Sequence, residues 1–196
     1  MISFHPRKIV TTGEGGMVLT GHEGLASALR AIRNHGIDGA GRFSSPGMNF
    51  RMGEIQGAIG EAQMGKLGRM VARRREIAAI YARLLPKPVA MQEAVAGAET
   101  NWQTLAAVLP ESAGEAGRDA VIGSLAERGI EATVASYCVP ALEAYGGWGR
   151  DPMEYPSAAR AARLGMALPM HAGMTDAAAE EVCRAVGAAV GAQGGR

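Results

Sequence analysis

The sequence predicts an α/β fold in two parts, with part of a larger mixed domain at the N-terminus and a small α+β domain at the C-terminus. Short apolar runs surround a glycine-rich turn within 9–20, and one long amphipathic segment extends over 53–85. Strand and helix patterns then alternate over 102–136. The predicted parts are 1–52, the remnant of the larger domain; 53–86, a connecting helix; and 87–196, the small domain.

The N-terminal region predicts a strand, a tight turn and a second strand. Residues 9–12 and 17–20 are apolar or β-branched, and Gly13-Glu14-Gly15-Gly16 between them is typical of a turn. Its spacing matches neither a P-loop nor a dinucleotide-binding motif, so we interpret Glu14 and its glycines as turn-forming. Two or three strands cannot cover both faces of an α/β layer. We therefore expect the first domain to be incomplete.

The first helix is expected over 23–34, where apolar residues recur at helical spacing. Gly36 follows as a stop signal, and the glycine-rich stretch 36–48 is expected to be irregular.

The longest periodic segment predicts a helix over 53–85 that ends at Pro86 and kinks near the glycines of 65–68. The arginine run 73–75 lies within it, and we interpret this run as a solvated helix face rather than a nucleic-acid site. Thr175 is a good N-cap for the last helix. The other expected elements are a strand over 102–109, a helix over 116–128, a strand over 130–136 and the last helix over 175–190.

Composition excludes several classes of function. The net charge of +1 and the charged fraction of 20% give no reason to expect a nucleic-acid or anionic-membrane partner. No stretch approaches the roughly 18 apolar residues of a membrane span, and the first residues do not resemble a signal peptide. We expect a cytoplasmic protein.

Cysteine and histidine do not predict a metal site. Cys138 and Cys183 are widely separated and flanked by apolar residues, so we expect buried free thiols in a reducing compartment. His35 and His171 have no partner at metal-ligand spacing and are interpreted as structural. The eleven methionines are expected to fill the core.

Lys8 is the candidate for covalent chemistry. It lies directly before the predicted strand and glycine turn. A lysine that forms a Schiff base needs a fixed position and an amine whose pKa is lowered by burial or by nearby cations. From local context alone, an ordinary solvated lysine remains the alternative.

The motif around Lys8 resembles a known signature. Residues 3–16 (SFHPRKIVTTGEGG) resemble the lysine motif of the DegT/StrS sugar aminotransferases, which are fold-type I enzymes that use pyridoxal phosphate (PLP). Residues 33–36 (RNHG), 47–56 (GMNFRMGEIQ) and 168–176 (LPMHAGMTD) are similar to further blocks of that family, in the same order. The resemblance extends over the whole chain, but over only about the C-terminal half of a family member.

The resemblance implies roles for individual residues. Lys8 matches the lysine that bonds to PLP and moves a proton between the substrate carbon and the cofactor. Ser3 matches a hydroxyl that contacts the cofactor phosphate, and Asn49 an asparagine that reaches the phosphate in the partner subunit of a homodimer. His5 and Tyr137 are candidates for substrate contact, although a locally hydrogen-bonded histidine is an equal alternative for His5.

The resemblance also implies an activity: transfer of an amino group, with glutamate as the expected donor, to the keto group of a nucleotide-linked sugar. Related dehydratases have histidine in place of this lysine. The presence of Lys8 therefore favours transamination over dehydration. Pro140 occupies a position where many members have a substrate-facing histidine. Arg51 is expected to anchor the following helix or the dimer contact.

Members of the family hold the PLP ring with residues that precede the lysine. We therefore expect this chain to be inactive alone. The alternatives are a non-catalytic dimer partner and one half of a split enzyme.

Overall fold

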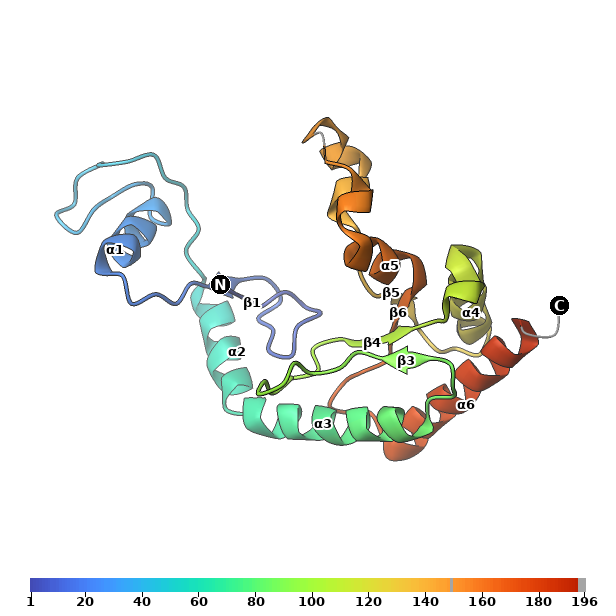
Figure 1. The fold of residues 1–196 in the computed structure, drawn as a ribbon. Helices are drawn as coiled ribbons and strands as arrows, with labels where there is room; N and C mark the ends of the chain where they lie inside the picture. Colours follow the sequence, from blue (N-terminus) through green and yellow to red (C-terminus); the bar gives the residue numbers. More distant parts are fainter. Residues whose placement is uncertain (149, 194–196) are drawn as a thin grey trace. The chain divides into compact units, whose positions relative to one another are not determined.

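A computed structural model describes residues 1–148 and 150–193, and it combines helices with sheets as the sequence predicts (Figure 1). The chain divides into two compact units, Met1–Arg69 and Met70–Arg196. The expected three-part division stays a prediction.

The first unit contains a two-stranded antiparallel sheet of β1 (Ile2–Ser3) and β2 (Gly16–Met17). The predicted strand over 9–12 is wrong, and the one predicted over 17–20 is reduced to its start. A strand needs a neighbour to pair with. Here the segment folds back, and the Thr12 N–H donates to the Phe4 carbonyl at 3.1 Å.

Helix α1 (Glu23–Ile32) forms where helical spacing predicts it. Its N-cap is His22, whose Nδ1 accepts the Leu25 N–H at 3.0 Å. The chain leaves the helix at Gly36, which has a φ of 78° and donates its N–H to the Ala31 carbonyl at 2.9 Å. Glycine is suited to this position because a positive φ costs it little.

The single long helix predicted over 53–85 is two helices in the structure, α2 (Glu54–Met64) and α3 (Leu67–Leu84). They are separated at Gly65 and Lys66, within the glycine region where a kink is expected.

The second unit is built on a four-stranded antiparallel sheet in the order β3-β4-β6-β5. Its central pair joins Leu105 to Leu168 and Val108 to Gly165. The sequence predicted the regions of β4 and β5 but missed β3 and β6. The strands are β3 (Ala90–Met91), β4 (Leu105–Val108), β5 (Thr133–Val134) and β6 (Gly165–Leu168).

Among the described residues, three further α-helices besides α3 accompany this sheet. Thr175 caps α6 as predicted, because its hydroxyl oxygen accepts the Ala178 N–H at 3.2 Å. The sequence missed α5 and the short 3₁₀ helices. The helices are α4 (Gly114–Glu127), α5 (Pro156–Leu164), α6 (Asp176–Gln193), η1 (Glu111–Ala113), η2 (Val139–Ala141), η3 (Glu143–Trp148) and η4 (Pro152–Glu154).

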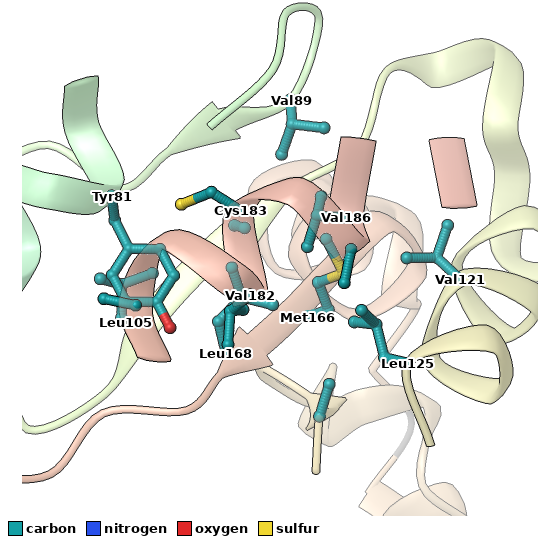
Figure 2. Packing of buried hydrophobic residues seen from close by; sticks show 14 of the residues in the cluster. Tyr81, Val89, Leu105, Val121, Leu125, Met166, Leu168, Val182, Cys183 and Val186 are labelled. Atoms are coloured by element: carbon teal, nitrogen blue, oxygen red, sulfur yellow. The ribbon is translucent and has the colours of Figure 1, made fainter. Parts of the chain in front are cut away.

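Side chains from α3, α4, α6 and the sheet form the core of the second unit (Figure 2). Tyr81, Leu105, Leu125 and Met166 are completely buried. Full burial of one such side chain contributes roughly 1.5–3 kcal/mol. The Tyr81 hydroxyl donates to the Pro169 carbonyl at 2.8 Å, and burial raises the pKa of Tyr81. The aromatic ring is thus buried with its polar end satisfied.

Sulfur-containing residues divide between core and surface. Cys138 and Cys183 are buried free thiols, as predicted. Burial raises the pKa of the Cys183 thiol to about 11. Met166 and Met174 lie in the core. The expectation that methionines generally fill the core is wrong, since six are exposed: Met1, Met17, Met48, Met52, Met64 and Met153.

Only part of the arginine run 73–75 is a solvated face, because Arg75 is exposed whereas Arg74 is not. Arg74 is 94% buried, with a relative exposure of 6%, and its Nη1 donates to the carbonyls of Trp102 at 2.7 Å and Gln103 at 3.3 Å. Removal from water lowers the pKa of Arg74. The sequence interpretation fails because it treated three neighbouring arginines as equivalent.

The flanking arginines contact other segments. Arg73 pairs with Asp176 at 2.6 Å, and Arg75 pairs with Glu99 at 2.7 Å. Successive residues point about 100° apart around a helix, so three consecutive arginines reach three separate places. One turn of α3 is thereby tied to the segment before β4 and to the start of α6.

The first unit buries far fewer apolar side chains than the second. Phe4, Val10 and Ala31 are its buried hydrophobic residues among those described. Helix α2 has no buried residue. Several large apolar side chains of the unit are exposed, including Leu25, Ile32, Phe50, Ile55 and Ile59.

Candidate functional site

Lys8 lies on a loop whose base is fixed at Phe4. The Phe4 N–H donates to the Gly15 carbonyl at 2.9 Å. Its carbonyl accepts the Thr12 N–H at 3.1 Å and the Thr11 hydroxyl at 2.9 Å. Phe4 itself is buried. The backbone between Phe4 and Thr11 is therefore a closed loop that presents Lys8.

A tight turn places Lys8 within this loop. The Lys8 N–H donates to the His5 carbonyl at 2.9 Å, and Pro6 occupies the second position, where its fixed φ favours a turn. The Arg7 N–H donates to Nδ1 of His5 at 3.2 Å. The His5 N–H in turn donates to the Ser3 hydroxyl oxygen at 3.3 Å. Three of the predicted site residues, Ser3, His5 and Lys8, are thus brought together.

The side chains of Ser3 and Lys8 face solvent. Because the Ser3 oxygen accepts from the His5 backbone, its hydroxyl proton remains available to donate. A hydroxyl donor and an ammonium group suit an anionic ligand such as a phosphate.

The structure confirms that the glycines of 13–16 form a turn, as the sequence predicts. Gly13 and Gly15 have φ values of 84° and 146°. A Cβ on Gly15 would lie 2.9 Å from both the Thr12 hydroxyl oxygen and the Met52 methyl carbon. The absence of a side chain therefore lets the segment that contains Met52 approach the Lys8 loop.

The motifs at 33–36 and 47–56 form one interlocked structure. Asn34 and Asn49 form an isolated antiparallel bridge, and the His35 N–H donates to the Met48 carbonyl at 3.1 Å. His35 has a φ of 59°, which is uncommon for a residue with a side chain. This structure fixes the backbone on either side of Asn49.

Two glycines allow the strands of this structure to approach. A Cβ on Gly36 would overlap the Ser45 carbonyl oxygen, and one on Gly47 would overlap the Gly36 nitrogen. Gly36 also has a positive φ. A larger residue would displace backbone atoms at either position.

The amide of Asn49 has a defined contact. Nε of Arg51 donates to its Oδ1 at 3.0 Å. With its oxygen occupied, the amide group presents its N–H₂ donors to other ligands. Arg51 was expected at the helix start or dimer surface. In the structure it orients Asn49, and Gly53 is the N-cap of α2. The sequence does not reveal this contact.

Tyr137 belongs to the second unit. It lines a cavity of about 300 Å³ together with Ser136, Cys138, Leu142 and Arg118. The Tyr137 side chain is exposed, and the residue is 65% exposed overall. This volume is at the small end of ligand pockets.

Sequence reasoning missed Arg118, which is buried and pairs with Glu115 and Asp119, because nothing in its local sequence distinguishes it from a surface arginine.

Within residues 1–148 and 150–193, no group of three or more metal-ligating side chains was found. No helix in the same ranges has both the length and the hydropathy needed to cross a bilayer.

The model of the DegT/DnrJ/EryC1/StrS aminotransferase family matches residues 1–187. The chain belongs to this family. The match covers both units, which agrees with the order of the motifs described above.

Curated relatives of this aminotransferase family support the assignment. The GDP-perosamine synthase of Caulobacter vibrioides is 33% identical over 190 residues, which is 94% of this chain and 50% of the relative. The dTDP-4-dehydro-2,3,6-trideoxy-D-glucose 4-aminotransferase of Saccharopolyspora spinosa is 32% identical over 196 aligned residues, 89% of this chain and 48% of the relative. The chain spans about half the length of these relatives.

Solved structures of the family have the same fold. Helicobacter pylori PseC, an aminotransferase of pseudaminic acid biosynthesis, matches with a TM-score of 0.88 and 26% identity, covering 96% of this chain and 52% of that one. The aminotransferase TlmJ from Streptoalloteichus hindustanus matches with a TM-score of 0.85 and 28% identity, covering 98% and 52%. A putative sugar aminotransferase from Streptococcus pneumoniae, in its PLP form, gives a TM-score of 0.87 at 22% identity, covering 97% and 51%.

Proposed function

We propose that this chain forms the lysine-bearing half of a PLP-dependent aminotransferase that acts on a nucleotide-linked keto sugar. The observation that supports this most directly is the position of Lys8, on a tight turn within a loop closed at Phe4. Such a loop fixes the backbone that carries the Lys8 amine, and covalent catalysis requires a positioned nucleophile.

The residues present fit PLP. Ser3 has its oxygen occupied by the His5 N–H and its proton available. Asn49 has its Oδ1 occupied by Arg51 and its N–H₂ available. Both residues that would contact a phosphate are therefore oriented as donors, which matches an acceptor-rich anion.

Bound PLP would supply the electron sink for breaking the bond to hydrogen at the substrate carbon. Lys8 would hold the cofactor through its ε-amine and, once released, move a proton at that carbon. Ser3 and Asn49 would fix the phosphate end, with Asn49 reaching the cofactor of the partner subunit in a homodimer.

The substrate class is proposed from the relatives. The names of two relatives, from Caulobacter vibrioides and Saccharopolyspora spinosa, refer to GDP- and dTDP-linked sugars. We extend this to a nucleotide-linked keto sugar, with glutamate as the amino donor. His5 and Tyr137 are the proposed substrate contacts, and the cavity beside Tyr137 offers space for part of a ligand.

The exposed apolar residues of the first unit support the need for a partner. Leu25, Phe50 and Ile55 face solvent here. Burying them against a second polypeptide surface would be favourable. We propose that activity requires a homodimer and the residues that precede the lysine in relatives, whether these lie upstream or on a separate chain. A non-catalytic dimer partner is the second candidate, and the same exposed residues favour it.

The test is a titration with PLP of the chain expressed with the coding sequence upstream of residue 1. We expect the visible absorbance band of lysine-bound PLP, which glutamate should bleach by converting the cofactor to its amine form. Lys8→Ala should abolish the band, and Lys66→Ala should retain it as the matched control. A band that persists in Lys8→Ala would remove Lys8 from the proposal. Binding without any amino transfer to a panel of nucleotide keto sugars would favour the non-catalytic partner.

A further inference from the structure

We propose that His5 is a positioning residue, whose Nδ1 accepts the Arg7 N–H and thereby fixes the turn that presents Lys8. The importance of this turn for catalysis rests on the proposed function of Lys8. The role of His5 in the turn depends only on the contacts of residues 3–8.

His5 takes part in the turn through three separate groups. Its N–H donates to the Ser3 hydroxyl oxygen at 3.3 Å, and its carbonyl accepts the Lys8 N–H at 2.9 Å. Its ring nitrogen Nδ1 accepts the Arg7 N–H at 3.2 Å. The turn is therefore closed twice, once through the backbone and once through the side chain. Pro6, which lies between His5 and Arg7, restricts the turn further because the proline ring fixes its own φ.

The side-chain bond follows a known local pattern. Asparagine and aspartate side chains accept the N–H two residues later in the chain and so stabilise a turn. Nδ1 of His5 does the same for Arg7. A residue with an acceptor at this distance from the backbone can therefore replace histidine, whereas an apolar residue of similar size cannot.

The contact also specifies the chemical state of the ring. A nitrogen that accepts a hydrogen bond has no proton, so the neutral ring must be protonated on Nε2. Nε2–H is then the group of His5 left to donate to a ligand. The chain contains an internal comparison, because Nδ1 of His22 accepts the Leu25 N–H at 3.0 Å in the same way.

Nitrogen-15 NMR of the full chain without cofactor tests this directly. Ring correlations of the neutral imidazoles should show the Nε2–H tautomer for His5 and for His22. Amide exchange at Arg7 should become about three- to tenfold faster in His5→Leu, because one exposed hydrogen bond contributes modestly to closing the turn. His5→Asn should keep exchange at Arg7 within about twofold of the original.

Two results would overturn the inference: an Nδ1–H ring for His5, or unchanged exchange at Arg7 in His5→Leu. PLP titration of the protein expressed with its upstream sequence extends the test to Lys8. There, His5→Leu should weaken the absorbance band and His5→Asn should restore it. A weakened band in both variants would contradict the positioning of Lys8 through the His5 acceptor and would indicate that the ring itself contacts the cofactor. Failure of the original protein to bind PLP would contradict the proposed function and leave the exchange result valid.

Discussion

The two units of this chain are stabilised in different ways. The second unit has a continuous core in which Tyr81, Leu105 and Val186 are completely buried. In the first unit, hydrogen bonds and close backbone contacts at Phe4 and at Gly36 define the structure, while many large apolar side chains face solvent. Burial is the dominant favourable term in folding, and a net hydrogen bond contributes about 1 kcal/mol.

This difference corresponds to the distribution of the proposed site residues. Ser3, His5, Lys8 and Asn49 all lie in the first unit, on segments shaped by turns and glycines. Tyr137 lies in the second unit. The geometry proposed for the Lys8 loop therefore depends on local hydrogen bonds, although the surrounding unit has little core of its own.

The largest expected effect concerns the core. Leu105→Ala removes a completely buried side chain from the central strand β4, and we expect it to lower the free energy of unfolding of the second unit by about 2–5 kcal/mol. The matched variant Leu25→Ala, at a side chain in α1 that is 46% exposed, should lower the free energy of unfolding of the first unit by less than about 1 kcal/mol. Urea denaturation followed by circular dichroism gives both values. Equal losses would show that the first unit has a core of comparable importance.

A smaller effect is expected at the arginine run. Arg74→Ala leaves the Trp102 and Gln103 carbonyls without their donor, and should cost about 1–3 kcal/mol. The substitution also removes the buried Nε of Arg74, which has no hydrogen-bond partner. Its desolvation cost disappears in the variant, and this offsets part of the loss. Arg75→Ala, which removes an exposed pair with Glu99, should cost about 0–1 kcal/mol. Indistinguishable urea midpoints for the two variants would contradict the role of burial here.

The effect expected at Gly36 is local to the first unit. Gly36→Ala must adopt a positive φ, which costs about 1–2 kcal/mol, and its Cβ would displace the Ser45 carbonyl. We expect faster amide exchange at Met48, whose N–H donates to the Ile32 carbonyl, and little change in the second unit. Gly39→Ala, where a Cβ would meet nothing within 4 Å, is the control. Unaltered exchange at Met48 in Gly36→Ala would show that the interlocked structure does not require glycine at this position.

Helices were the part of the fold that the sequence predicted best. The regions of α1, α4 and α6 follow from apolar periodicity within one segment, and the Thr175 cap from a single residue. Strands were harder because pairing depends on residues far apart in the chain. Residues 9–12 have β-branched composition but fold back onto Phe4, and β6 was missed although it lies at the centre of its sheet.

Motif resemblance selected Lys8 and its neighbours as candidate site residues, but it did not predict the contacts that hold them. The acceptor role of His5 and the pairing of Arg51 with Asn49 depend on side-chain rotamers, which the letters alone do not specify. Arg74 shows the same limit. Its burial depends on the rotation of α3 about its axis, and Arg73 and Arg75 look identical to it in the sequence.

The interlocked structure between Gly36 and Gly47 has a practical consequence for protein engineering. Its ends are fixed by close backbone contact, while its tip at Gly39 and Gly41 has open space around both glycines. A loop held at its base can accept extra length at its tip at low entropic cost. We therefore expect a short peptide inserted at this tip to be tolerated while Asn49 stays in place.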